Sequence, residues 1–533
     1  MAMAPMIQLL MPEVVLLIGA SMILMVGLSR SLSRHAMALA LVSVLVSLWA
    51  AWRSADGGGG LPEVASLNVG PLVWYVRLVT LAIGVLILLV NRSVPVAEER
   101  GEFFALILFS LCGVMLVSVA NNLILLFLAL ELVSVPTYIL IGLSRRDIRA
   151  QEATGKYFFL GAFAAAMTLY GFSFLYGAAG TMTLFGSSTS LAGVLSTTEA
   201  LSDPLVLLGL VLAVGGLTFK VAAVPFHFYV ADVYQGAASP VTGMLGFVPK
   251  FAGFVAIIRV LSLCGWQYSD GVFWMLWGLA AATMTVGNTL ALKQHNVKRM
   301  LAYSGVAHTG YVLVALVAGP MADGVGTPLR NGLTAVMFYL AVYGVMNLGA
   351  FAALAYFRKP GDEGEDDSVE MLEDLGGAAR RHPWASLALS ICVLGLMGFP
   401  LTGGFLGKLY VFSAALSSSG GASAHSTAMI VLVVIGVLNA AIAAAYYLRI
   451  LASCYLRPPA EGVVASDCHA VRLCLALCSV FVLAAFVRPG VLFDQSQKAV
   501  EGVSRAGVIE ADRTAQQAEV NVPARVSVGK AAD

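Results

Sequence analysis

The chain has 533 residues, of which 59% are hydrophobic and only 11% are charged, and its mean hydropathy is +0.87. Because soluble domains carry about 25% charged residues, this composition excludes a soluble globular protein and predicts an all-α polytopic protein embedded in a lipid bilayer. The formal net charge of +1 gives no reason to expect nucleic acid as a partner.

Runs of about 20 apolar residues predict about fourteen transmembrane helices along the chain. The first run has no charged segment before it and no small-residue cleavage site, so we expect it to remain as a span. Basic residues occur in alternate loops, from Arg30 and Arg34 to Arg457. The positive-inside rule places these loops in the cytoplasm and both termini on the outer side. The predicted spans cover residues 7–28, 36–53, 71–90, 103–119, 123–143, 155–176, 205–230, 240–262, 272–291, 300–318, 331–357, 384–417, 427–448 and 471–487.

Four charged side chains lie near the middle of otherwise apolar spans: Glu131, Lys220, Lys250 and Lys408. An ionisable group at the bilayer centre costs roughly 2.5–3.5 kcal/mol, so four of them facing lipid would cost about 10 kcal/mol. We therefore expect them to face one another or water, which is typical of an ion or proton path. The alternatives are a structural salt bridge for Glu131 and structural anchoring for the lysines.

Two of the predicted spans contain residues that interrupt a helix. Pro225 stands in span seven, GLTFKVAAVPFHFYVADVYQG, where it removes a backbone donor and clashes with the preceding turn. Span twelve, GLMGFPLTGGFLGKLYVF, contains Pro400 and several glycines before Lys408. Irregular backbone at membrane depth survives only where it is buried in protein or lines a wet cavity. Two broken helices at matching places are typical of an inverted-repeat transporter.

The two broken helices predict two inverted five-helix repeats, which comprise spans four to eight and spans nine to thirteen. This prediction depends on the architecture alone, since the two halves share no strong residue-level identity. The expected divisions are an N-terminal three-helix segment at 1–100, a first repeat at 101–265, a second repeat at 266–460, a C-terminal helix at 461–490 and a polar, disordered tail at 491–533.

Three further residues are weaker candidates for a proton path. His227 follows the break in span seven, where a helix-end role is an equal alternative. His308, in LAYSGVAHTGY, lies well inside span ten and is placed to bridge the two halves. Lys156 opens span six and can instead extend its ammonium to the membrane interface. The same interfacial position is expected for Arg77 and Arg259, which lie near span ends.

The sequence contains no motif for a metal or a cofactor. Its seven cysteines are scattered, without a CxxC pair or a Cys/His cluster at metal spacing. No GxGxxG, Walker A or iron–sulfur spacing occurs in any loop. We therefore expect this chain to bind neither a metal nor a redox cofactor.

Several long motifs carry a resemblance to a known family. The chain resembles the antiporter-like subunits of respiratory complex I, the proton-pumping NADH:quinone oxidoreductase, over about residues 10–490. That family also includes subunits of Mrp-type antiporters and membrane hydrogenases. The motifs are PEVVLLIGA, NNLILLFLALELVSVPTYIL, EATGKYFFLGA, FKVAAVPFHFYVADVYQGAASPVTGMLGFVPKFAGF, NVKRMLAYSGVAHTGY and LTGGFLGKLYVF.

Three details make the resemblance closest to the subunit-N type. The element DVYQGAASPVT precedes Lys250, span twelve carries Lys408 where subunit M has glutamate, and no long amphipathic arm follows span fourteen, as subunit L would require. One loop departs from the family, which usually reads PDVYEGAP. Ala231, Gln235 and Ala238 stand there instead, so the loop lacks one carboxylate.

The resemblance implies one proton channel in this chain, in the bacterial cytoplasmic (inner) membrane. NADH, FMN, iron–sulfur clusters and quinone would belong to other subunits of the complex, which are the implied partners. Glu131 would pair with Lys220, Lys250 and His308 would carry the proton laterally, and Lys408 would release it to the outer face. Since burial disfavours a charged lysine and a nearby carboxylate favours it, movement of Glu131 would load or eject a proton.

Three other functions remain open on the sequence. A Mrp-type Na⁺/H⁺ antiporter would work without NADH and would respond to sodium, and a membrane hydrogenase subunit would use another electron donor or acceptor. A structural subunit with vestigial charges would tolerate neutral substitutions at positions 131, 220, 250 and 408.

Overall fold

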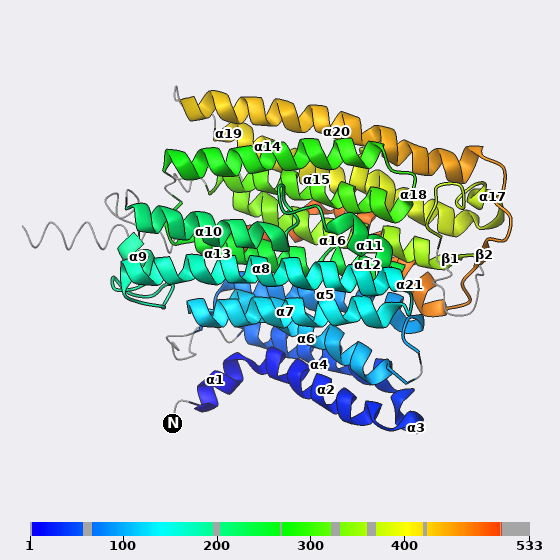
Figure 1. Ribbon diagram of the computed structural model, residues 1–533, viewed down its shortest axis with the longest axis horizontal. Helices are drawn as coiled ribbons and strands as arrows, with labels where there is room; N and C mark the ends of the chain where they lie inside the picture. The colour runs from blue at the N-terminus through cyan, green and yellow to red at the C-terminus, as the bar shows by residue number, and fades with distance from the viewer. Residues whose placement is uncertain are drawn as a thin grey trace, which may run out of the picture.

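The computed structural model describes residues 3–56, 67–96, 98–195, 203–266, 269–320, 331–359, 369–418, 424–501 and 503. In this part of the chain, long helices lie side by side along one direction (Figure 1). The N-terminal helices lie at one edge of the bundle and α20 lies at the opposite edge. The helices of the N-terminal half are α1 Met3–Leu9, α2 Met11–Gly27, α3 Arg30–Ser33, α4 Ala36–Asp56, α5 Pro71–Val90, the short 3-10 helix η1 Asn91–Ser93, α6 Arg100–Val119, α7 Leu123–Ser144, α8 Ile148–Ala179, α9 Leu191–Leu195, α10 Pro204–Lys220, α11 Val230–Gly236, α12 Ser239–Leu245 and α13 Val248–Ser262.

The second half of the chain is also built from helices, with one very short strand pair. Strand β1, Phe357–Arg358, pairs antiparallel with β2, Val464–Ala465. We call the end of the bundle that holds β1, β2, α3 and α17 the strand end, and the opposite end, where α9 lies, the α9 end (Figure 1). The remaining helices are α14 Asp270–Leu292, α15 Val297–Ala318, α16 Gly332–Tyr356, α17 Ala378–Arg381, α18 Pro383–Met397, α19 Gly403–Ser417, α20 Ala424–Leu456 and α21 His469–Val487.

Eleven helices in the described residues are long and apolar enough to cross a membrane, and three shorter apolar helices accompany them. The prediction of an all-α polytopic membrane protein is thus confirmed. The apolar windows of Ser239–Ser262, Val297–Ala318 and Gly332–Tyr356 are entirely buried. A helix that is apolar all round is suited to such a central position. These three segments form the middle of the bundle, and they carry Lys250 and His308.

Small polar residues fix where several of the helices begin. The side chain of Asp147 accepts a hydrogen bond from the Ala150 amide at the start of α8, and Asn296 accepts one from the Arg299 amide at the start of α15. Such N-caps satisfy backbone donors that have no partner inside the helix. The cap at Asn296 sets the register of α15, the helix that carries His308.

Both predicted helix breaks occur in the described structure. Helix α10 ends at Lys220 and α11 begins at Val230, so the interruption starts before Pro225. The reason is local, since Ala222 has a left-handed φ of 60° and turns the chain out of the helix. The second break separates α18 from α19, with Gly398 at φ 82° after the last helical residue. Lys408 lies inside α19, beyond the break.

The chain continues as a helix after α21 instead of becoming an unstructured tail. Residues 489–501 are helical, and Phe493 and Ser496 are buried. The Ser496 hydroxyl donates a hydrogen bond of 3.0 Å to the Tyr75 hydroxyl. The predicted tail at 491–533 is therefore wrong for its first part, because apolar and small residues at helical spacing give this stretch a packing face. Residues from 504 onward lie outside the described part of the chain.

Candidate functional site

Glu131 and Lys220 form an ion pair between α7 and the last residue of α10. The Lys220 ammonium lies 2.9 Å from Glu131 Oε1, and it also donates to the Ser134 hydroxyl. The Lys220 side chain is 5% exposed and that of Glu131 is 25% exposed. Ser134 was not predicted, although it stands three residues after Glu131, on the same helix face.

Lys250, on α13, is solvated by neutral oxygen atoms. Its ammonium donates to the Gly305 carbonyl at 2.5 Å and to the Tyr343 hydroxyl at 3.4 Å. In the described part of the chain, no carboxylate forms an ion pair with it. Gly305 makes this contact possible, since a Cβ there would lie only 2.8 Å from Lys250 Nζ.

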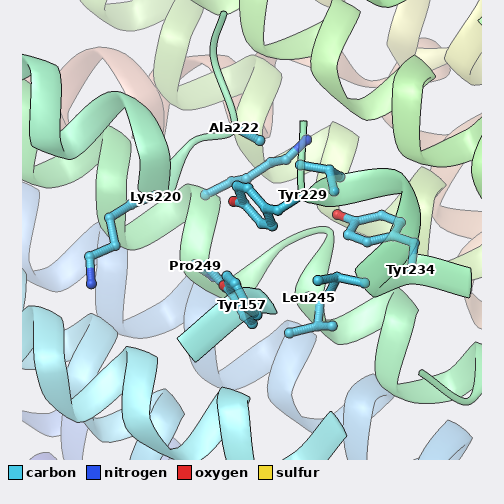
Figure 2. A pocket seen from close by; sticks show the side chains of 10 residues that line it. Tyr157, Lys220, Ala222, Tyr229, Tyr234, Leu245 and Pro249 are labelled. Atoms are coloured by element: carbon cyan, nitrogen blue, oxygen red, sulfur yellow. The ribbon is translucent and has the colours of Figure 1, made fainter. Parts of the chain in front are cut away.

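A small cavity lies between Lys220 and Lys250. Figure 2 shows the rings of Tyr229 and Tyr234 in its wall, with the Lys220 ammonium directed away from them. The Tyr229 ring stacks on Tyr157 at a centroid distance of 5.1 Å. The cavity is therefore lined by both buried lysines and by several tyrosine side chains.

Both ring nitrogens of His308 are within hydrogen-bond distance of tyrosine hydroxyls. Nδ1 lies 2.6 Å from the Tyr339 hydroxyl, and Nε2 lies 3.0 Å from the Tyr447 hydroxyl. The imidazole is 2% exposed. Because one ring nitrogen of a neutral imidazole donates and the other accepts, His308 can relay a proton between the two phenols without an exposed intermediate.

The side chain of Lys408, on α19, reaches the C-terminal end of α18. Its ammonium donates to the carbonyls of Leu396 and Met397 at 3.2 and 2.8 Å. It also lies 4.9 Å from the centroid of the Tyr311 ring. The last carbonyls of a helix have no partner inside it and carry partial negative charge, so the break creates the binding place for this cation.

Tyrosine rings connect the buried cations of the second half. The Tyr343 ring lies 5.4 Å from Lys250 Nζ and its centroid lies 5.0 Å from that of His308. The Tyr311 ring lies 5.8 Å from His308 and is also the ring beneath Lys408. The structure thus brings Lys250, His308 and Lys408 into one row, with tyrosines between them that sequence reasoning missed.

Lys156 and His227 lie apart from this row. Lys156, at the start of α8, is 41% exposed and pairs with Glu152 at 2.7 Å and with Asp232 at 2.8 Å. Burial raises the pKa of Asp232, but hydrogen bonds from Lys156 and Arg299 outweigh it and hold that pKa below its ordinary value. The half-buried His227 has no partner for Nδ1 among the described residues.

Arg77 and Arg259 do not extend to a membrane interface, so that prediction is wrong. Arg77 is 2% exposed and pairs with Glu13, with contacts of 2.7 and 2.9 Å. Arg259 is 3% exposed and donates to the Ser118 carbonyl. Buried oxygen acceptors on neighbouring helices replace water for the Arg77 guanidinium. In Arg259, only Nη2 has such an acceptor, and Nε and Nη1 have no hydrogen-bond partner among the described residues. Glu13, in PEVVLLIGA, was overlooked as a charged residue within the first span.

Comparisons with known proteins identify the family to which the chain belongs. A family model described as "NADH:quinone oxidoreductase/Mrp antiporter, TM" matches residues 120–442. NADH-quinone oxidoreductase subunit N 1 of Solibacter usitatus is 36% identical over 475 residues, which cover 88% of this chain and 91% of that protein.

Two solved structures show the same fold. A chain of "Respiratory complex I from Thermus thermophilus with bound Aureothin" has a TM-score of 0.73 and 29% identity, over 91% of this chain and 98% of that chain. A chain of the Mrp complex from Dietzia sp. DQ12-45-1b has a TM-score of 0.75 and 19% identity, over 96% of this chain and 99% of the other, which is a likeness of fold alone. The chain therefore belongs to the NADH:quinone oxidoreductase/Mrp antiporter membrane family, and within it to the relatives of NADH-quinone oxidoreductase subunit N.

Proposed function

We propose that this chain is the proton-translocating membrane subunit of an NADH:quinone oxidoreductase. The observation that carries the proposal is a series of ionisable residues that begins at the ion pair of Glu131 with the buried Lys220 and continues through the buried residues Lys250, His308 and Lys408. Such groups at membrane depth are expensive and mark ion or proton routes. NADH, FMN, iron–sulfur clusters and quinone would be bound by other subunits, which are its partners in the membrane.

The proposed architecture has fourteen crossings of a bacterial inner membrane. Eleven are the long apolar helices of the described residues, and the shorter helices α2, α10 and α18 supply the others. Residues 101–265 and 266–460 are two inverted five-helix repeats, after an N-terminal segment at 1–100 and before a C-terminal helix at 461–490. The broken helices α10/α11 and α18/α19 support this division, since each occurs at a corresponding place in its half.

The Glu131–Lys220 pair is the switch in the proposed mechanism. A carboxylate beside a lysine favours the charged ammonium, and its withdrawal leaves a buried charge that burial disfavours. Ser134, within reach of the same ammonium, holds Lys220 when Glu131 moves. The proton released on withdrawal passes to Lys250 across the cavity lined by Tyr157, for which a bridging water is the natural carrier.

The second half of the route moves the proton laterally and then outward. Lys250 passes it through His308, whose two nitrogens contact two phenols, and Lys408 releases it to the outer face. Lys156 and His227 belong to the uptake side of the route in this proposal. Lys156 and its partner Asp232 are both partly exposed, which supports that position.

The experiment is NADH-driven acidification of inside-out membrane vesicles from cells that carry Lys250→Ala. NADH oxidation and assembly of the complex are recorded in parallel. The matched control is Lys293→Ala, which removes an exposed lysine at the end of α14. We expect acidification to collapse in the first variant and to persist in the second, with both complexes assembled. Unchanged pumping in Lys250→Ala would refute the route.

A Mrp-type Na⁺/H⁺ antiporter or a membrane hydrogenase subunit is the second candidate, since the matching family description includes Mrp antiporters. The same vesicles separate the candidates. Pumping that needs NADH and continues without sodium supports the oxidoreductase subunit. Proton movement that requires sodium and ignores NADH supports the antiporter.

A further inference from the structure

A short segment after β1 is anchored to the beginning of α15. The Val297 amide donates to the Glu370 carbonyl at 2.7 Å, and the Leu372 amide donates to the His295 carbonyl at 3.1 Å. Within the segment, the Met371 amide donates to the Asp374 carboxylate at 3.0 Å. The backbone of residues 369–374 is therefore fixed against the N-terminal end of the helix that carries His308.

The side chain of Glu370 joins two parts of the molecule that are distant in sequence. Glu370 Oε1 lies 2.9 Å from Arg145 Nη1, just after α7, and 3.4 Å from Lys298 Nζ, in the first turn of α15. Glu370 Oε2 accepts a hydrogen bond from the side-chain nitrogen Nδ2 of Asn296 at 3.2 Å. The side chains of Arg145 and Lys298 are 6% and 0% exposed, so this carboxylate neutralises buried cations.

A second carboxylate makes a similar bridge beside the first. Asp232 accepts from Lys156 on α8 at 2.8 Å and from Arg299 on α15 at 2.7 Å. Lys298 and Arg299 are neighbours in sequence, and each is joined to a cation of the α7–α8 region through a shared carboxylate. The Glu370 bridge is the more buried of the two, because Glu370 is 17% exposed and Asp232 is 35% exposed.

We infer that Glu370 is a positioning residue for the proposed proton route: it fixes the beginning of α15 against the end of α7 and thereby sets the contact between Gly305 and Lys250. Gly305 lies about 10 Å along α15 from Lys298. The apolar window of α15 is entirely buried and close-packed, so a displacement at its first turn is transmitted along it. This inference rests on the proposed function, because it concerns the geometry of that route.

The physical consequence of losing the carboxylate follows from the charges. Without Glu370, the ammonium of Lys298 and the guanidinium of Arg145 would lie near each other without the anion between them. Arg145 retains Asp147 at 2.9 Å, so the end of α7 keeps one anchor. The Lys298 ammonium keeps the neutral Ala237 carbonyl at 3.3 Å but loses a carboxylate, so we expect the first turn of α15 to be destabilised, because removing the counter-charge of a buried cation is destabilising.

The test compares Glu370→Gln, Glu370→Asp and Glu373→Gln in the assembled complex. Glu373 is a matched control, because it lies in the same segment and its side chain is exposed. We expect Glu370→Gln to lower the ratio of proton pumping to NADH oxidation about three-fold or more. Glu370→Asp should restore part of that ratio, and Glu373→Gln should leave it unchanged. Hydrogen exchange of the peptide that covers 297–305 should rise most in Glu370→Gln and should not change in Glu373→Gln.

Three results would overturn the inference. The first is a Glu370→Gln complex that pumps as well as Glu373→Gln. The second is reduced pumping with unchanged hydrogen exchange in α15, which would assign Glu370 a different role. The third comes from Arg145→Gln, which removes the same contact from the other side. If the losses in Glu370→Gln and Arg145→Gln simply add in the double variant, the two residues do not act through one bridge.

The outcomes remain distinct from those that test the function itself. If Glu370→Gln prevents assembly, Glu370→Asp and Arg145→Gln are compared instead. The two measurements stay the same: the ratio of proton pumping to NADH oxidation, and hydrogen exchange of the peptide 297–305. Intact pumping in Lys250→Ala refutes the proton route. Lost pumping in Lys250→Ala together with normal pumping and exchange in Glu370→Gln refutes only the positioning role.

Discussion

The three buried lysines of the proposed route have three different kinds of partner. Lys220 contacts a carboxylate, Lys250 contacts a carbonyl and a phenol, and Lys408 contacts two carbonyls at a helix end. Only the partner of Lys220 has a charge that a single proton can remove. This difference places the switching step of the proposed route at Glu131 and leaves the other two lysines as sites that accept and pass on a proton.

The first prediction concerns the space that Gly305 leaves for Lys250. In Gly305→Ala, the new Cβ would lie 2.8 Å from Lys250 Nζ and 2.9 Å from the Tyr343 hydroxyl, so the ammonium must leave its position. We expect pumping per assembled complex to fall several-fold, because a displacement of about 1 Å from a productive geometry can cost up to about 100-fold. NADH-driven acidification measures the effect.

Gly278→Ala is the control for that substitution. Gly278 lies in α14, and no heavy atom would come within 4 Å of its new Cβ. Alanine is a better helix former than glycine by about 1 kcal/mol, so this variant should assemble and pump normally. Equal pumping by the two alanine variants would mean that the Lys250–Gly305 contact does not matter to the route.

The cost of burying charge explains which of these residues the sequence could predict. A charged group in an apolar span stands out in the sequence, and Glu131, Lys250 and Lys408 are predicted for that reason. A tyrosine hydroxyl is cheap enough to bury that Tyr339 and Tyr343 look like ordinary packing residues in the sequence. Their contacts with His308 and Lys250 depend on how three helices pack, which no local pattern encodes.

At the scale of the helix, two ion pairs that each contain a buried cation differ in their use. Glu131 and Lys220 join α7 to α10 on the proposed route. Glu13 and Arg77 join α2 to α5, where Arg77 also donates to the Leu9 carbonyl at 2.9 Å. The Glu13–Arg77 pair has more hydrogen bonds and is less exposed to solvent than the Glu131–Lys220 pair. It is therefore suited to hold two helices together and not to separate during proton transfer.

The second prediction tests that assignment with Glu13→Gln. Breaking a buried pair by removing one partner costs about 3–5 kcal/mol, because the other charge stays buried. We expect the level of assembled complex, read on native gels, to fall strongly, while each complex that does assemble pumps at the normal rate. Removal of both charges in Glu13→Gln/Arg77→Met should recover much of the assembly. Normal assembly combined with lost pumping would instead move this pair onto the proton route.

The helices themselves were easier to predict than their exact ends. Apolar runs and Pro225 predict the interrupted segments. The first break nevertheless starts after Lys220, because Ala222 adopts a left-handed conformation that cannot be predicted from the composition. The helix over 489–501 was missed for a related reason. Its polar residues outweigh its apolar ones on average, and only the helical spacing of Phe493 and Ser496 reveals the face that packs.

At the scale of the whole molecule, the two ends of the bundle differ in charge. The strand end carries the basic residues of α3, β1 and α17, which include Arg30, Arg358 and Arg380. Helix α21 begins beside β2 and runs toward the α9 end, where α1 also lies (Figure 1). The positive-inside rule therefore predicts that the strand end faces the cytoplasm and that the α9 end faces outward.

The third prediction tests this orientation with single cysteines in a Cys468→Ser background, since the other six native cysteines are buried. Ser188→Cys is exposed near α9, and Ser31→Cys is exposed in α3. A maleimide that cannot cross membranes should label Ser188→Cys in intact spheroplasts, and it should label Ser31→Cys only in inside-out vesicles. The predicted spans two to six lie between the two positions, and an odd number of crossings puts them on opposite sides. The reverse pattern would mean that the protein has the opposite orientation and that the route runs in the opposite direction. Labelling of both cysteines from the same side of the membrane would mean that the number of crossings between them is even, which contradicts the inverted repeat.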